Sequence, residues 1–443
     1  MTAARPARRV SWDLLRCAFL LMVVLYHGTF IAPLVYHQFA PRILVFAHQI
    51  GASLLLALSA YFVAAGLSDP ARATARWWWS RVTRLLPAFV VATLLAFAAL
   101  RWLAPAGMFH PSLYNLVTNL VMLWNWNGVR HWFYVDPSYW TLPLQLMAFS
   151  LAPLLRRSRL GRGRGLRVLL WAAVLVPLAQ WPLEQTAGPI YDTVADGLGL
   201  YRWHLFVAGV TVWMLATGRV RRGHGAALLA TCVAAHAVQI GTLLQHGGLA
   251  TDPWSVLGVG LGLLAMTAAA IGPDVAAWLP GPVVRAVTSL AGCSYGIFLV
   301  HQTLGDVLML RLQEDFGAGP GLQLAAMLLN GVAVGALLTR FVERPAHRAL
   351  LRTWDRRHEP DRLPAVSRGV RPVGVPLGVS ALTTRGWGPW RTACSSPTTT
   401  GPSGSPWPGP SSSRDTRSRR STTASARWPG RGRPTSTPWS STS

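Results

Sequence analysis

The first apolar stretch of the chain, WDLLRCAFLLMVVLYHGTFI from Trp12 to Ile31, constrains the fold more than any other segment. A helix of roughly 20 residues at ~1.5 Å per residue is long enough to cross a bilayer once. This stretch nevertheless contains Asp13, Arg16 and His27. Charged and titratable side chains are costly in hydrocarbon, so within a membrane span they usually face a protein interior or a polar cavity.

Helical geometry places these three side chains on one side of the predicted helix. The eleven steps from Arg16 to His27 amount to about 1100°, within roughly 20° of three full turns, and they raise the imidazole by ~16 Å. Asp13 lies three residues before Arg16, on the same side. Two interpretations are open: a functional face with a carboxylate, a guanidinium and an imidazole, or an Asp–Arg pair at the helix start with an interfacial histidine.

The composition is that of a membrane protein. The 443 residues are 51% hydrophobic and 13% charged, and 41 basic residues against 16 acidic ones give a net charge of +25. All the basic residues are arginines, and many lie in short loops beside apolar segments, which is the positive-inside pattern of membrane proteins. We therefore expect no nucleic-acid partner. The four cysteines form no CxxC pair or His/Cys cluster, so the sequence predicts neither disulfides nor a metal site.

Hydropathy and loop charge together predict an all-α polytopic membrane helix bundle of about ten transmembrane helices. Arginine-rich loops alternate with acidic ones, such as the loop with Glu184, Asp192 and Asp196 and the loop with Asp306, Glu314 and Asp315. This alternation predicts that both termini are cytoplasmic in a multi-pass protein of the plasma membrane. The predicted spans are residues 12–31, 44–67, 85–104, 139–155, 167–183, 201–218, 224–245, 254–272, 286–304 and 321–341.

One segment between the spans is too short and too polar to cross a membrane. Residues 112–128 include Asn115, Asn119, Asn125 and Asn127. Because polar backbone at membrane depth is tolerated only around a cavity, this segment is predicted to be re-entrant or interfacial and to help line a site.

The chain divides into two predicted regions. Residues 1–352 form a ten-span membrane domain. Residues 353–443 are rich in Arg, Ser, Thr, Pro and Gly and have no apolar run long enough to span, which predicts a disordered, low-complexity cytoplasmic tail. A second interpretation is that part of this tail is out-of-frame translation of GC-rich DNA.

Several motifs occur in an order that resembles one known family. They are Arg16 and His27 separated by ten residues, RVTRLLP from Arg81, YWTLPLQ from Tyr139, CSYGIFLVHQ from Cys293, and Glu343-Arg344-Pro345. Together they resemble the membrane-bound acyltransferase-3 family, which O-acylates sugars and related hydroxyl compounds. Gln145 stands where the family usually has a glutamate. Glutamine forms hydrogen bonds but cannot act as a general base. The Glu343-Arg344-Pro345 motif is also typical of a salt-bridged helix end, because proline stops helices.

The resemblance implies an integral-membrane O-acyltransferase that moves an acetyl or other short acyl group from acyl-coenzyme A to a sugar-bearing acceptor. The donor is a substrate, and no bound cofactor is expected. His27 is the best candidate base because imidazole titrates near neutral pH. Arg16 and Asp13 are the other two predicted catalytic residues. The expected substrate-binding residues are Trp140, Gln145, Arg81, Arg84, Ser294, Tyr295 and His301. For His301, a packed histidine at the outer interface is an equally good interpretation.

Two other functions fit the same sequence. A polytopic transporter or flippase would use Asp13, Arg16 and His27 as a polar relay within ten spans. An inactive membrane partner would have lost catalysis, and Gln145 is the only residue that suggests it.

Overall fold

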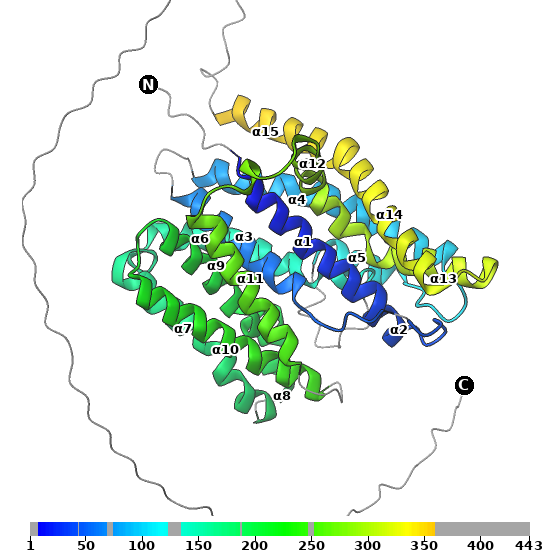
Figure 1. Cartoon of the computed structure of the whole chain (residues 1–443), viewed down its shortest axis with the longest axis horizontal. Coiled ribbons are helices and arrows are strands. Elements are labelled where there is room, and N and C mark those ends of the chain that lie inside the picture. The colour runs from blue at the N-terminus through cyan, green and yellow to red at the C-terminus, as the bar shows by residue number, and fades with distance from the viewer. Residues whose placement is uncertain are drawn as a thin grey trace, which may run out of the picture. The chain divides into compact units, whose positions relative to one another are not determined.

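A computed structural model describes residues 8–42, 44–68, 74–122, 134–186, 188–246 and 252–358 (Figure 1). Within these ranges the regular structure is entirely helical, with no strand. The predicted all-α membrane bundle is therefore confirmed as a class. The bundle lies within the first of two compact units, residues 1–366.

Six helical segments in the described part of the chain are long and apolar enough to cross a membrane. Two shorter apolar helical segments, Gly51–Leu67 and Leu200–Ala216, coincide with further predicted spans. The predicted number of about ten spans is thus not confirmed, although several apolar helices indicate a multi-pass membrane protein. The six segments are Val10–Val35, Thr74–Leu103, Arg222–Ile240, Pro253–Ile271, Gly281–Val300 and Pro320–His358.

The longer helices form two groups that meet at α3 (Figure 1). The first group contains α1 (Val10–Tyr26), α4 (Thr74–Ala98), α12 (Gly281–Val300), α13 (Gln302–Phe316) and α14 (Pro320–Leu338). The second contains α6 (Thr141–Arg157), α7 (Gly163–Thr186), α9 (Trp203–Ala216), α10 (Arg222–His246) and α11 (Pro253–Ile271). The helix α3 (Gly51–Leu67) packs against α1 on one side and α9 on the other. The remaining α-helices are α2 (Ala32–Val35), α5 (Leu113–Leu120), α8 (Gly188–Leu198) and α15 (Arg344–His358).

Small residues let these helices approach closely. A Cβ atom added to Gly209 of α9 would overlap the carbonyl oxygen of Ala57 in α3. A Cβ on Gly296 of α12 would likewise overlap the carbonyl oxygen of Gly335 in α14. Helices in membranes associate through such close packing because lipid provides no hydrophobic drive between them. The second contact holds α14 against the end of α12, where His301 follows.

Tertiary contacts changed several predicted boundaries. The second predicted span began at residue 44, but α3 begins at Gly51. The backbone N–H of Phe46 donates to Thr29 Oγ1, and His48 pairs with Asp252, so the preceding residues are held outside the helix. The predicted loop after residue 304 is also wrong, because α13 continues to Phe316 and buries Asp306. Similarly, α8 occupies part of the loop expected after α7.

The proline of the Glu343-Arg344-Pro345 motif does not end the helix. A π-helical turn, η8 (Thr339–Glu343), precedes α15, which continues through Pro345 to His358. A wider turn accommodates the missing N–H and the ring of proline. The predicted tail began at residue 353, yet α15 includes residues 353–358; the rest of the tail lies outside the described residues.

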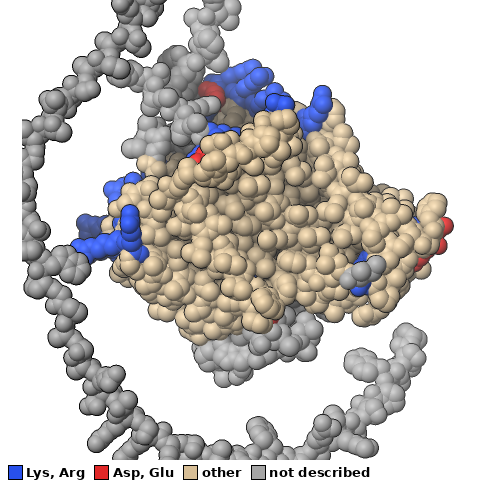
Figure 2. Space-filling view, viewed as in Figure 1, with Lys and Arg blue, Asp and Glu red and all other residues tan. Residues whose placement is uncertain are grey.

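Charged side chains are concentrated at the ends of the bundle. Figure 2 shows most basic side chains over α15 and at the edge where α7 begins, and an uncharged surface separates them from acidic residues near the end of α13. We call the basic end of the bundle the arginine-rich end. It contains the loop from Arg156 to Arg167, the turn from Arg219 to Arg222, and α15. An apolar belt between charged ends is the distribution expected for a membrane span.

Candidate active site

A buried pair of histidines lies where two helices break. His27 is the first residue of a π-helical turn, η1 (His27–Ile31), that continues α1. His301 stands between the last residue of α12 and the first of α13. His27 Nδ1 and His301 Nε2 are 2.8 Å apart, and the two residues are 8% and 0% exposed. Single π-helical turns are frequent at functional sites.

The hydrogen bonds of the pair define its protonation pattern. His301 Nδ1 lies 2.8 Å from the backbone oxygen of Phe298, and a carbonyl can only accept, so this nitrogen carries a proton. In neutral His301, Nε2 is then an acceptor, and His27 Nδ1 must donate to it. The remaining nitrogen of His27, Nε2, therefore carries a lone pair, and it accepts no hydrogen bond from the described residues. This is the tautomer that a general base requires.

A buried carboxylate lies beside this pair. Asp136 is 0% exposed and close enough to His301 for their charges to interact. Its Oδ1 accepts from the backbone N–H and the hydroxyl of Ser138, and its Oδ2 accepts from the backbone N–H of Thr303. A carboxylate fixed in this way stabilises positive charge on the histidine pair.

The asparagines of residues 112–128 support this carboxylate indirectly. Asn119 Oδ1 accepts from the backbone N–H of Val135, the residue before Asp136. Asn119 in turn donates to the carbonyl of Asn115, which forms a capping box with Ser112 at the start of α5. The two asparagines thus position a wall of the site rather than line it. Asn125 and Asn127 lie outside the described residues.

Sequence reasoning missed Asp136, although a signal was present. It is the only acidic residue between Asp69 and Glu184. A lone acid within more than a hundred mostly apolar residues is a candidate functional group by its rarity.

The carboxylate of Asp13 and the guanidinium of Arg16 lie at the other end of α1, away from the histidines. Asp13 is buried and forms two hydrogen bonds with Arg8, of 2.6 and 3.0 Å. Arg16 Nη1 is 3.9 Å from Asp13 Oδ1, and its guanidinium lies over the ring of Phe62. The predicted Asp–Arg pair exists, but Arg8 is the closer partner of Asp13.

Arg84 adds a second guanidinium to this end. Its Nε donates to Glu343 Oε1 at 3.0 Å, and Glu343 Oε2 also accepts from Thr339. Arg84 and Arg16 are close enough for their charges to repel. Both side chains retain exposed surface, 43% for Arg84 and 26% for Arg16. Two adjacent, partly exposed guanidinium groups favour the binding of an anion such as phosphate.

The other predicted substrate-binding residues have structural contacts of their own. Tyr295 donates to the backbone oxygen of Leu85, and Ser294 donates to Ala291 within its own helix. Arg81 lies over the ring of Trp77. Gln145 is half-buried on α6. The structure therefore places His301 against His27 but brings none of these four side chains to the histidine pair by a described contact.

Trp140 contacts a buried arginine that the sequence analysis did not single out. The guanidinium carbon of Arg202 lies 3.9 Å from the centroid of the Trp140 ring, a cation–π geometry. Beyond Arg202 lies a second histidine pair, with His204 Nε2 3.3 Å from His236 Nδ1. Both histidines are 0% exposed, and they join α9 to α10.

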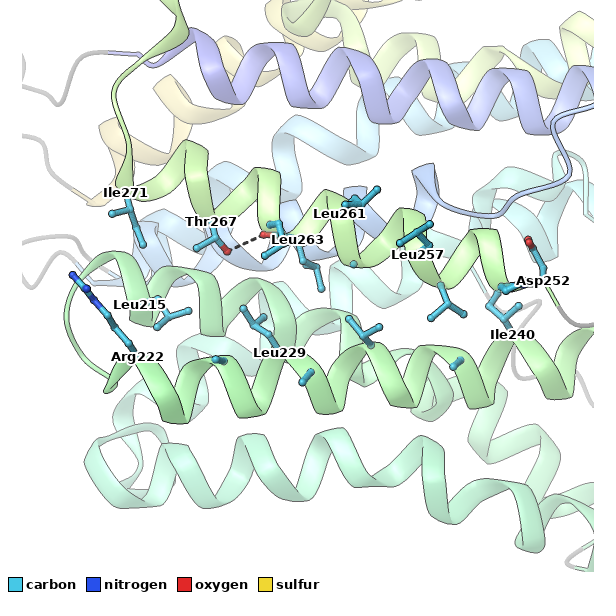
Figure 3. Close-up of a pocket in the computed structure, with 18 residues that line it drawn as sticks. Leu215, Arg222, Leu229, Ile240, Asp252, Leu257, Leu261, Leu263, Thr267 and Ile271 are labelled. Atoms are coloured by element: carbon cyan, nitrogen blue, oxygen red, sulfur yellow. Dashed lines mark hydrogen bonds between the residues drawn. The ribbon is translucent and has the colours of Figure 1, made fainter. Parts of the chain in front are cut away.

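An apolar groove of about 1400 Å³ lies elsewhere, between α10 and α11 (Figure 3). Arg222 is at one end, Asp252 is at the other, and leucines such as Leu229 and Leu257 point into it between them. Neither His27 nor His301 lines this groove. No group of three or more His, Cys, Asp or Glu side chains within the described ranges is arranged to hold a metal ion.

Comparison with known families agrees with these observations. The model of the acyltransferase-3 family, described as an acyltransferase domain, matches residues 9–340. No curated protein and no solved structure gives a significant match to the chain. The chain belongs to the acyltransferase-3 family. It is a membrane acyltransferase, and the matched region contains both His27 and His301.

Proposed function

We propose that the protein transfers an acetyl or other short acyl group from acyl-coenzyme A to a hydroxyl group of a sugar-bearing acceptor. The observation that carries this proposal is the His27–His301 pair, because its hydrogen bonds leave His27 Nε2 with a free lone pair. Acyl transfer to a hydroxyl needs such a base, a binding site for the donor and stabilisation of the charge that develops.

In the proposed reaction, His27 Nε2 takes the proton of the acceptor hydroxyl as its oxygen attacks the thioester carbonyl carbon. The positive charge that forms is shared with His301 and stabilised by the carboxylate of Asp136. The carbon–sulfur bond of the tetrahedral intermediate then breaks. His27 returns the proton to the coenzyme A sulfur, so that the enzyme ends in its starting state.

Arg16 and Arg84 are the proposed phosphate-binding residues of the donor. The rise from Arg16 to His27 is ~16 Å. The pantetheine arm has about as many backbone bonds as four extended residues, or ~14 Å. A coenzyme A molecule whose phosphates lie at the arginines would therefore bring its thioester close to His27.

This arrangement goes with a definite orientation. Arginine-rich loops favour the cytoplasm, which is also where acyl-coenzyme A is available. We therefore place the arginine-rich end and both termini on the cytoplasmic side of the plasma membrane. Gln145 is not needed as a base in this scheme, since His27 fills that role.

The proposal is tested by coenzyme A release from acetyl-coenzyme A by the purified protein, with and without candidate sugar acceptors. Acceptor-dependent release that is lost in His27→Ala supports it. Release that persists in His27→Ala would remove the proposed base. Tight donor binding without release would point to another acyl chain or acceptor, and transport of the acceptor without coenzyme A release would instead support the transporter that the sequence left open.

A further inference from the structure

A cavity of about 880 Å³ lies among α3, α6, α7 and α9, in a part of the bundle that acyl transfer does not use. Its walls are mostly apolar, with side chains such as Val63, Met147, Leu170, Phe206 and Trp213. Ligand sites in proteins commonly measure ~300–1,000 Å³. The cavity thus has the size and lining to hold hydrocarbon.

The mouth of the cavity is basic. Four arginines line it at the arginine-rich end: Arg156 at the end of α6, Arg162 before α7, Arg167 near the start of α7, and Arg219 after α9. None of the described residues that line the cavity is acidic. Guanidinium groups bind phosphate through paired, charge-assisted hydrogen bonds. A ligand that fits both ends therefore has an apolar chain and a phosphate.

The helix α3 separates this cavity from the proposed donor site. Tyr61 and Phe62 contact Trp12 of α1, and Arg16 lies over Phe62. Ala64 and Val63, on the other side of α3, line the cavity. A donor held by Arg16 would lie on the α1 side and would not fill the cavity.

We propose that this cavity binds an anionic phospholipid of the bilayer, with an acyl chain between the helices and the phosphate at the four arginines. A lipid fits better than a soluble phosphate compound because most of the lining is apolar. A bound chain supplies the packing contacts that an empty cavity lacks. It would thereby join α6 and α7 to α3 and α9.

The test uses the full-length protein, stripped of lipid in dodecyl maltoside, and measures its unfolding temperature as lipid is added. Dioleoylphosphatidylglycerol should raise the unfolding temperature saturably, and dioleoylphosphatidylcholine should raise it much less. In the triple variant Arg156→Gln, Arg162→Gln, Arg167→Gln, the half-saturating concentration of phosphatidylglycerol should rise ~10-fold, as expected when charge-assisted contacts to phosphate are lost.

A matched control comes from the same loop. Arg157, Arg159 and Arg164 are exposed and do not line the cavity. Changing these three to glutamine removes the same charge and should leave the half-saturating concentration within about twofold of wild type. Equal losses in the two triple variants would mean that general charge attraction explains the effect, and the proposal would be wrong.

A second variant tests the chain-binding part. Ala148→Trp should fill the cavity and abolish the response to phosphatidylglycerol without lowering the unfolding temperature of the lipid-free protein. A full response in this variant would place the lipid elsewhere. Palmitoyl-coenzyme A is the last ligand to be tested. If it competes with phosphatidylglycerol, and if its half-saturating concentration rises more in the variant of Arg156, Arg162 and Arg167, the cavity is a donor site. The phospholipid assignment would then be overturned.

Discussion

Two histidine pairs are buried in the described part of the bundle, and they differ in their neighbours. His27 and His301 have a carboxylate beside them, Asp136, and a backbone carbonyl that fixes the tautomer of His301. For His204 and His236 the nearest strong charge is instead the guanidinium of Arg202, which acts on both, while the carboxylate of Asp252 acts more weakly on His236 alone. A carboxylate stabilises a proton gained by an imidazole, whereas a guanidinium opposes it.

Exposure separates the pairs as well. His27 retains 8% of its surface, while His204 and His236 retain none. His27 is therefore the only one of these four histidines that keeps a small exposed surface. Burial and an imidazole contact alone do not distinguish the pairs, whereas the neighbouring charges and this exposure do. The second pair is better suited to joining α9 to α10.

The largest expected effect is a difference in acyl-transfer rate between variants of the two histidine pairs. His27→Ala should lower the rate of acyl transfer ~10³-fold, within the range of lost general-base catalysis. His204→Ala should change that rate less than about threefold. The measurement is coenzyme A release by both variants at equal amounts of folded protein. Similar losses in both would show that the neighbouring charge does not distinguish the pairs.

The next prediction tests the carboxylate itself. Asp136→Asn should lower kcat ~10-fold, which corresponds to about 1.4 kcal/mol of lost charge stabilisation. Asp306→Asn is the matched control. Burial, with the nearby charge of Asp136, raises the pKa of Asp306 well above its usual range, which favours its uncharged form. Its replacement by asparagine keeps a polar side chain of the same size and should leave kcat nearly unchanged.

A third prediction contrasts the two ends of α1. Arg16→Gln should raise the KM for acyl-coenzyme A ~10-fold and change kcat less, because it removes binding of the donor rather than the base. Asp13 keeps its two hydrogen bonds to Arg8 in this variant. Arg285→Gln, which changes an exposed arginine of α12, should leave both constants unchanged. A fall in kcat at constant KM would move Arg16 into the chemical step.

The smallest expected effect concerns the start of α1. Asp274 accepts hydrogen bonds from the backbone N–H groups of Val10 and Ser11, where a helix lacks internal partners. Burial raises the pKa of Asp274, but these bonds and that of the Ser11 hydroxyl outweigh it and lower the pKa below its usual value. Asp274→Ala should cost about 1 kcal/mol of stability at pH 7, as lost helix caps do.

The sign of the pH dependence follows from the lowered pKa. The contribution of Asp274 is complete above its unfolded pKa of about 4 and is lost as the pH falls through the lower folded value. The difference in unfolding temperature between wild type and Asp274→Ala should therefore shrink as the pH falls below about 4. A constant difference down to pH 2 would contradict the assignment.

Much of the fold and part of the site could be predicted from the sequence. Apolar runs and loop arginines predicted an all-helical membrane bundle, because hydrocarbon tolerates only a satisfied backbone. The spacing of Arg16 and His27 predicted that both lie on one side of this helix, since helical periodicity is a local property. Three predictions were wrong: the start of α3, the loop where α13 lies, and the helix end at Pro345. Contacts between distant segments decide these features.

The sequence by itself determined the class, the family motifs and the candidate base, since each depends on residue type and short spacing. Only the tertiary structure decided that His27 meets His301, that Asp136 lies beside them, and that Arg84 lies near Arg16. His27 and His301 are 274 positions apart in the sequence, and Asp136 and its partner Thr303 are 167 apart. No local pattern encodes such pairs, because helix packing and close glycine contacts determine which faces of α1, α12 and α14 meet.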